Sequence, residues 1–204
     1  MSQRITVFGE LTVSKESFPV EGVRAYSVTG TPADCVKVAL AYMYEENDKP
    51  DFCFSGINHG YNAGYDILYS GTIGACVEAL SEGVKAFAFS LEMNDIFDVV
   101  DEYMYDITKA LMEEKIPKNA LWNINFPGCS LEEYKGVKRN VKIASHQLYL
   151  DNYEKEAMDA ENFILKPRGI PVTKSKEGTD VWALGENYIS VGIVESAVLA
   201  NEKM

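Results

Sequence analysis

Residues 51–72 have the sequence DFCFSGINHGYNAGYDILYSGT, and this stretch decides the fold class. Its first four residues form a short apolar segment, which is typical of a strand buried on both faces of a parallel sheet. A glycine-rich loop follows, and a second helix is expected to start near Thr72 and to stop near Gly83. Ligands of open α/β sheets bind beyond the carboxyl ends of the strands. The loop therefore lies where a ligand would bind.

The segments on either side alternate between helices and strands. Thr31, Pro32 and Asp34 suit the start of a helix that ends before Pro50. Downstream, the pattern predicts strands at 85–91 and 121–126 and a helix over 95–115. This alternation is typical of a parallel α/β sheet with right-handed crossovers.

Both ends of the chain have a different character. Residues 4–13 are rich in β-branched side chains and predict a strand or hairpin arm. Residues 136–150 alternate as an antiparallel arm would, and the acidic segment 151–165 predicts a loop or surface excursion. The other expected elements are an extended piece at 26–28, a late strand at 187–194 and a terminal helix at 196–203.

Composition excludes some classes of partner. With 204 residues the chain is long enough for one α/β domain, with or without an appendage. A net charge of −12 argues against nucleic acid and against an anionic membrane surface. An acidic protein can still bind a small phosphate through backbone amides or a metal. The four cysteines have no zinc-site spacing and the N-terminus has no signal-peptide core, so a cytoplasmic protein is expected.

The loop has the residue types of an anion or metal site. Asn58 and Asn62 offer side-chain oxygens to a hard cation or amides to a phosphate, and Asp66 can brace the loop by accepting backbone hydrogen bonds. Ser70, Gly71 and Thr72 can direct amides and hydroxyls at an anion. The alternative is a plain glycine-rich turn with a helix cap. The spacing is not that of a P-loop, and by itself it names no reaction.

The literal residues are more specific, because three segments match one family in order along the chain. The first is V-x-GTPADCV at 28–36, and the second is SGIN-x-G-x-N-x-G-x-D-x-x-YSGT at 55–72. The third and weakest is GTD at 178–180, followed by YISV at 188–191. Together they resemble the signatures of the SurE family of survival-protein 5'/3'-nucleotidases.

This resemblance implies a hydrolase of the acid phosphatase type that uses Mg²⁺ or Mn²⁺ to hydrolyse nucleoside monophosphates. It also implies a Rossmann-like three-layer sheet, with a C-terminal arm and terminal helix that build a homodimer or homotetramer. Carried over by motif, Asn58 resembles a metal ligand, and Asn62, Ser70, Gly71 and Thr72 resemble the phosphate-binding residues. In such enzymes the metal activates water or polarises the phosphoryl oxygen, while amides stabilise the developing charge.

The chain departs from the family pattern at its beginning. Family members open with a strand ending in Asn-Asp-Asp-Gly, which supplies metal carboxylates and the base or nucleophile, and a later Ser-Gly segment supplies a serine ligand. This chain has no Asp-Asp pair, and Met1–Thr6 resembles the family just after that Ser-Gly segment. We therefore expect the first strand–helix–strand unit to be missing, no catalytic residue to be present, and metal binding and hydrolysis to be weakened or lost.

Loss of a first strand would also leave unpaired sheet edges, so reduced stability or compensating oligomer contacts are expected. The expected division is a truncated α/β phosphatase core over 1–130 and an arm and oligomerisation region over 131–204. Two alternatives stay open. The chain could be a catalytically dead paralogue that serves as a phosphate-binding module or oligomer scaffold, or a separate small chain could supply the missing piece.

Overall fold

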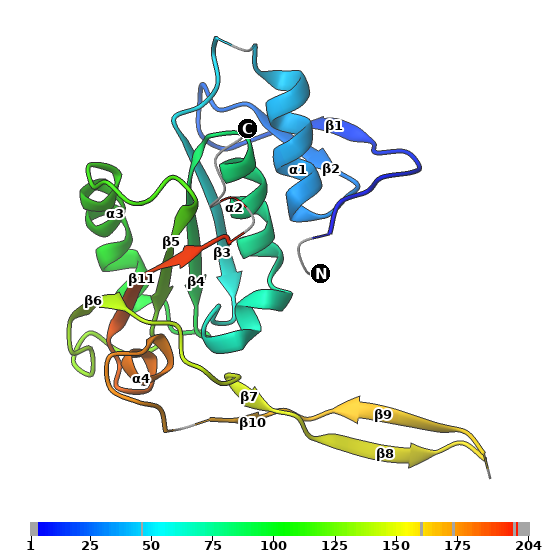
Figure 1. The fold of residues 1–204 in the computed structure, drawn as a ribbon, viewed down its shortest axis with the longest axis vertical. Coiled ribbons are helices and arrows are strands. Elements are labelled where there is room, and N and C mark those ends of the chain that lie inside the picture. The colour runs from blue at the N-terminus through cyan, green and yellow to red at the C-terminus, as the bar shows by residue number, and fades with distance from the viewer. Residues whose placement is uncertain (1–3, 46, 160, 173, 198, 200–204) are drawn as a thin grey trace.

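A computed structural model describes the chain apart from residues 1–3, 46, 160, 173, 198 and 200–204. Five strands form the central sheet: β3 (Phe52–His59), β4 (Lys85–Leu91), β5 (Ala120–Phe126), β6 (Val137–Val141) and β11 (Ile189–Glu195). Their order across the sheet is β3–β4–β5–β11–β6 (Figure 1). Neighbouring strands are parallel except for β5 and β11, which are antiparallel. The sheet is therefore mixed but mostly parallel.

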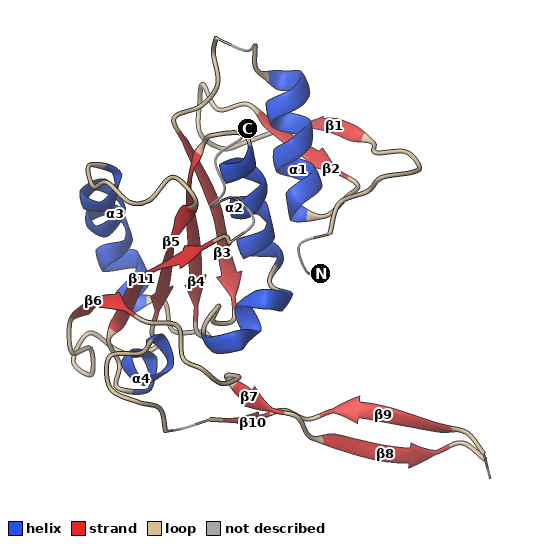
Figure 2. Cartoon of the chain, in the orientation of Figure 1, coloured by secondary structure: helices blue, strands red, loops and turns tan. Residues whose placement is uncertain are grey.

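Helices on both faces give the protein three layers (Figure 2). The helices are α1 (Pro32–Val38), α2 (Gly71–Ser81), α3 (Asp98–Met112) and α4 (Asp180–Gly185). Successive side chains of β4 point to opposite faces of the sheet and so contribute to both layers. Phe87 and Phe89 pack in the core beneath α3. Ala86 and Ala88 pack in the core beneath α1 and α2. The prediction of an α/β fold is confirmed.

Helix starts and stops lie close to their predicted places. The Thr31 hydroxyl accepts from the Asp34 N–H at 3.2 Å, and the Asp34 carboxylate accepts from the Thr31 N–H at 2.8 Å. This reciprocal capping box fixes the first turn of α1, which continues into one wider turn over Ala39–Met43. Helix α2 ends two residues before Gly83, whose φ of +81° lies in the left-handed region.

The strand predicted at 4–13 is wrong in its limits. The structure has strand β1 only at Val13–Glu16, paired with β2 at Ala25–Val28 in an antiparallel hairpin. Within the described residues, the stretch before Val13 has no neighbouring strand, and Thr6 instead donates two hydrogen bonds to Asp34. β-branched composition favours an extended chain, but only a partner makes it a strand.

Strand β3 lies at the edge of the sheet, so the prediction that it is buried on both faces is wrong. Within the described residues it pairs with β4 alone, and the side chains of Phe54 and Ile57 are 50% and 42% exposed. These side chains and α3 border an open apolar groove of about 520 Å³. The strand is also longer than predicted and runs through the first part of the glycine-rich loop to His59.

The prediction of an antiparallel arm over 136–150 is wrong for its first part. Strand β6 joins the central sheet and runs parallel to β11. It alternates in sequence because it is an outer strand with one face partly covered, where Lys138 lies over the rings of Trp182 and Tyr188. Alternating polar and apolar residues indicate that one face of a strand is covered, but they do not indicate whether the neighbouring strand is parallel or antiparallel.

An extended arm follows, and it projects away from the sheet (Figure 1). It consists of two antiparallel pairs, β7 (Tyr149–Leu150) with β10 (Ile170–Pro171) and β8 (Tyr153–Ala157) with β9 (Phe163–Pro167). The prediction of a loop over 151–165 is therefore wrong. Both faces of β8 and β9 are exposed, so the sequence lacks the apolar alternation of a half-buried strand. The ion pairs Glu154–Arg168 and Glu156–Lys166 connect the two sides of the hairpin.

Strand β11 confirms the strand predicted at 187–194. The terminal helix expected at 196–203 falls largely on residues 198 and 200–204, which lie outside the described residues. The division at residue 130 stays a prediction, and the structure places β6, α4 and β11, all from the second segment, on the central sheet. Of the helices that the structure describes, none is long and apolar enough to cross a membrane.

Replacing Asp34 with alanine is expected to lower the free energy of unfolding by about 2 kcal/mol, because the capping box and the hydrogen bonds from Thr6 are both lost. Burial raises the pKa of Asp34, but the hydrogen bonds from Thr6 and Thr31 outweigh it and hold the pKa at about 2, below the usual 3.8. A lowered folded-state pKa means that this stability is present above pH 4 and is lost as the pH falls towards 2. The free energies of unfolding of the parent protein and the variant, measured by urea titration from pH 6 to pH 2, should therefore converge at the acidic end. An equal loss for Glu21→Ala, an exposed turn residue, would contradict this assignment.

Candidate functional site

The candidate site lies at the carboxyl end of β3, where the chain turns back to start α2 (Figure 1). Gly56 allows this strand to approach β4 closely. Its φ is +128°, and a Cβ atom there would lie 2.4 Å from the Phe89 carbonyl oxygen. The ladder between β3 and β4 is irregular between Ser55 and Asn58, and this places Asn58 opposite Ser90 of β4. The glycine-rich segment is thus partly a strand rather than a free loop.

Ser70, Gly71 and Thr72 lie together at the start of α2, as predicted. Ser70 is the N-cap, and its hydroxyl accepts from the Ile73 N–H at 3.2 Å. Within the described residues the N–H groups of Gly71 and Thr72 donate to no acceptor. The first N–H groups of a helix carry partial positive charge and suit an anion.

Asn58 lies on β3, and its side-chain amide donates to the Gly60 carbonyl at 2.7 Å. This hydrogen bond uses one N–H and leaves the side-chain oxygen, the atom that would bind a metal. The residue is half-buried. Its predicted role as a metal ligand stays a prediction.

Asn62 is held against the sheet by three polar side chains that the sequence analysis did not identify. Its N–H donates to the Asn125 side-chain oxygen at 2.8 Å, and its side-chain amide donates to the Ser90 hydroxyl at 2.5 Å. Its carbonyl accepts from the side-chain amides of Asn123 at 2.9 Å and Asn125 at 3.2 Å. All four residues are buried. The available signal was the pair of asparagines, two residues apart, in the otherwise apolar strand LWNINF.

Two carboxylates fix the loop after Asn62, and both lie in segments that match the family. Asp180 accepts from the N–H groups of Gly64 at 2.9 Å, Ala144 at 2.8 Å and Val181 at 2.8 Å. Burial raises the pKa of Asp180, and these hydrogen bonds oppose the rise. Asp66 accepts from the Leu148 N–H at 3.0 Å, which confirms its predicted bracing role.

Other polar groups near the strand ends are engaged in structural contacts. Glu92 accepts from the Tyr61 hydroxyl and the Gly128 N–H, both at 3.0 Å. Burial, and then the Glu92 charge, raises the pKa of Tyr61. The N-cap of α3 is Phe97, so Glu92 does not cap this helix. His59 is exposed, and its Nε2 lies 3.1 Å from the Asn94 carbonyl.

The residues present do not fit the divalent metal that the family implies. Mg²⁺ and Mn²⁺ sites in proteins normally include carboxylates. Among the described residues no group of three or more His, Cys, Asp or Glu side chains could hold a metal ion. Near the loop, Asn58 offers one neutral oxygen, while Asp66 and Asp180 already accept backbone hydrogen bonds.

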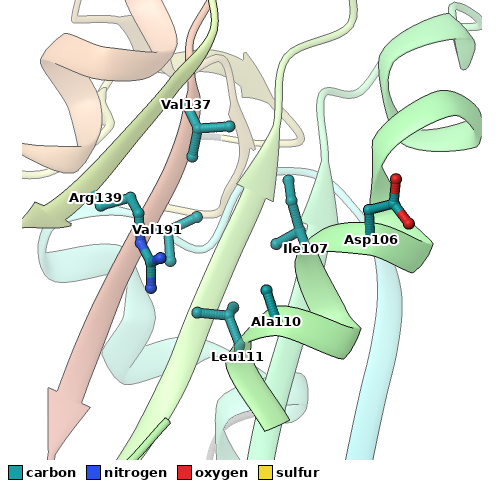
Figure 3. Close-up of a pocket in the computed structure, with 7 residues that line it drawn as sticks. All are labelled: Asp106, Ile107, Ala110, Leu111, Val137, Arg139 and Val191. Atoms are coloured by element: carbon teal, nitrogen blue, oxygen red, sulfur yellow. The ribbon is translucent and has the colours of Figure 1, made fainter. Parts of the chain in front are cut away.

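A pocket between α3 and the strands β6 and β11 is a poorer candidate. It has a volume of about 220 Å³ and its lining is mainly apolar (Figure 3). Arg139 is its cationic side chain, and the guanidinium is paired with Glu114 at 2.6 Å. The pocket therefore lacks the convergent free polar groups that catalysis or phosphate binding requires.

Comparisons with known proteins place the chain in a family. Residues 1–149 match the family model described as "Survival protein SurE". The chain is 35% identical over 208 residues to "5'-nucleotidase SurE" of Flavobacterium johnsoniae, covering 100% of this chain and 79% of that protein. It is 34% identical over 194 residues to the same-named protein of Clostridium botulinum, covering 93% of this chain and 75% of that protein. The SurE crystal structure from Aquifex aeolicus has a TM-score of 0.77 and 31% identity, covering 95% of this chain and 76% of that chain. The chain therefore belongs to the SurE family.

Proposed function

We propose that the segment between β3 and α2 binds the phosphate group of nucleoside monophosphates. The observation that carries the proposal is the start of α2, where the Ser70 hydroxyl accepts from Ile73 and leaves the N–H groups of Gly71 and Thr72 free for an anion. The relatives named 5'-nucleotidase supply the substrate class and make this a family of phosphomonoesterases. Because the whole chain carries a net charge of −12, local amides rather than net charge would provide the attraction.

We propose further that the described residues retain phosphate binding but hydrolyse phosphate esters only slowly. Helix N–H groups can stabilise the charge that develops on phosphoryl oxygens, and the first turn of α2 would do so here. Metal binding and general base catalysis need carboxylates, whereas Asp66 and Asp180 hold backbone N–H groups. The 204-residue polypeptide by itself is thus a slow nucleotidase or a phosphate-binding scaffold.

Two measurements on the purified chain test this proposal. Calorimetric titration with a nucleoside monophosphate in EDTA should show saturable binding, and turnover with added Mn²⁺ should fall far below a typical enzyme rate of about 10 s⁻¹. Absence of binding with and without Mn²⁺ would contradict the phosphate site. Turnover at ordinary rates would contradict the impaired hydrolysis and establish the nucleotidase. Turnover that appears only with a second polypeptide would show that the missing groups are supplied in trans.

We also propose that the arm joins two or more copies of the chain into a homodimer or homotetramer. The hairpin of β8 and β9 pairs only with itself within the described residues, and an isolated two-stranded hairpin is marginally stable in water. Large apolar side chains are exposed along it: Tyr153, Phe163, Ile164 and Leu165. A second copy that covers these side chains would stabilise the arm.

Replacing residues 151–168 with a short Gly-Ser linker should therefore convert the assembly into a monomer, as measured by light scattering. A matched control is Glu156→Ala, which removes an exposed ion pair with Lys166 and keeps the apolar side chains. This control should leave the molar mass unchanged. An unchanged mass for the linker variant would show that the arm does not hold the copies together.

A further inference from the structure

Four polar side chains form a row across the central sheet, close to the candidate site. The registers of successive strands place Asn58, Ser90, Asn125 and Ser190 side by side across β3, β4, β5 and β11. Residues opposite one another in a sheet share a face, so these side chains lie on the α2 face. Nearer the start of the strands the same face is apolar and carries Ala86 and other core residues. The face becomes polar only beside the candidate site.

Asn125 makes the most directed contacts in this row. Its side-chain oxygen accepts from the Asn62 N–H at 2.8 Å, and its amide donates to the Asn62 carbonyl at 3.2 Å. One side chain thus bonds both backbone groups of one residue, as a neighbouring strand would. The Asn123 amide strengthens the contact to the same carbonyl at 2.9 Å, and Asn123 in turn accepts from Asn125 at 3.3 Å.

We infer that Asn125, supported by Asn123, is a positioning residue that holds Asn62 in place for phosphate. This inference rests on the proposed phosphate-binding function. Two hydrogen bonds to opposite sides of one residue fix the orientation of both flanking peptide planes, which the glycine-rich segment would not fix by itself. Ser90 fixes the Asn62 side chain through a third contact at 2.5 Å. Preorganisation of this kind makes binding tighter, because the loop is already ordered and binding does not carry the entropy cost of ordering it.

Ser190 provides a matched control in the same row. It lies opposite Asn125, its residue is 1% exposed, and its hydroxyl has no hydrogen-bond partner within the described residues. Ser190→Ala therefore removes a buried polar atom at the same level of the sheet without touching Asn62. Asn125→Leu and Asn123→Leu are neutral substitutions of similar size, so any loss of phosphate affinity cannot come from added negative charge.

The test compares phosphate affinity with folding stability in these three variants. Inorganic phosphate is titrated into each folded protein in EDTA, the Asn62 amide resonance is followed by NMR, and thermal unfolding is measured separately. We expect phosphate binding to weaken about tenfold to a hundredfold in Asn125→Leu and about tenfold in Asn123→Leu, with a displaced Asn62 amide resonance. Ser190→Ala should bind as the parent does. If Asn125→Leu does not fold, Asn123→Leu, which removes only one contact to Asn62, carries the test.

Three results would overturn the inference. The first is a variant that loses thermal stability but binds phosphate like the parent protein, which would make Asn125 purely structural. The second is an equal loss of affinity in Ser190→Ala, which would assign the effect to the whole polar row. The third is a parent protein that binds no phosphate. That result would refute the proposed function itself, and it is distinguished from the others because it appears before any substitution is made.

Discussion

The substitution Asp180→Ala is expected to lower the free energy of unfolding by about 3–5 kcal/mol. The Asp180 carboxylate accepts from three backbone N–H groups, those of Gly64, Ala144 and Val181, and it is 2% exposed. Removing it leaves three buried donors without a partner, and each unsatisfied donor costs about 1–3 kcal/mol. The donors come from three separate segments, so their loss also separates the loop at Gly64 from α4 and from the base of the arm. Urea unfolding followed by circular dichroism measures the change.

Asp66→Ala is the matched control for this prediction. Among the described residues Asp66 accepts from one backbone N–H, that of Leu148, and it is half-buried. Its loss should cost about 1 kcal/mol. Equal effects of the two substitutions would show that Asp180 does not join the three segments in the way that the contacts indicate.

Gly64→Ala is expected to destabilise the protein by about 3 kcal/mol and to weaken phosphate binding. Gly64 has a φ of +56°, and a Cβ atom there would lie 2.3 Å from the His146 carbonyl oxygen. That carbonyl accepts from the Tyr65 N–H at 3.0 Å, so the added methyl group must push apart two segments that are bonded to each other. Thermal unfolding and phosphate titration of the variant measure the two effects.

Gly83→Ala is the control that separates the effect of the steric clash at Gly64 from the effect of backbone strain. Gly83 also has a positive φ, of +81°, but among the described residues no atom beyond its immediate chain neighbours lies within 4 Å of the position of its Cβ. It should therefore show only the conformational cost, about 1 kcal/mol, and bind phosphate normally. If both alanine variants behaved alike, the contact between Gly64 and His146 would not be close in solution.

The elements with strong local signals could be predicted from the sequence. Helix α1 was placed by Thr31, Pro32 and Asp34, because a capping box is formed by residues three apart. Strands β4 and β5 were placed by their apolar runs, and the start of α2 by Ser70. Each of these features depends on neighbours within a few residues. The family signature at 55–72 is likewise local, and the comparisons confirmed the family that it indicated.

The features that depend on distant partners could not be predicted. Strand β3 has the composition of a buried strand, but its exposure depends on which strands lie beside it. Strand β6 alternates as an antiparallel arm would, yet it pairs with β11 about 50 residues later. The contact of Asn62 with Asn125 spans 63 residues, and that of Gly64 with Asp180 spans 116. Sequence periodicity carries no information about contacts at such separations, so the polar row behind Asn62 became visible only in the structure.

The central claim is that the start of α2 and the loop at Asn62 form a phosphate site that works without a metal. The most direct measurement is a titration of the isotope-labelled chain with inorganic phosphate in EDTA, followed through backbone amide resonances. We predict saturable shifts that are largest at Gly71 and Thr72, smaller at Asn62, and reproduced by a nucleoside monophosphate. Shifts that appear only with Mn²⁺, or that cluster in the groove of Phe54 and Ile57 beside α3, would contradict this account.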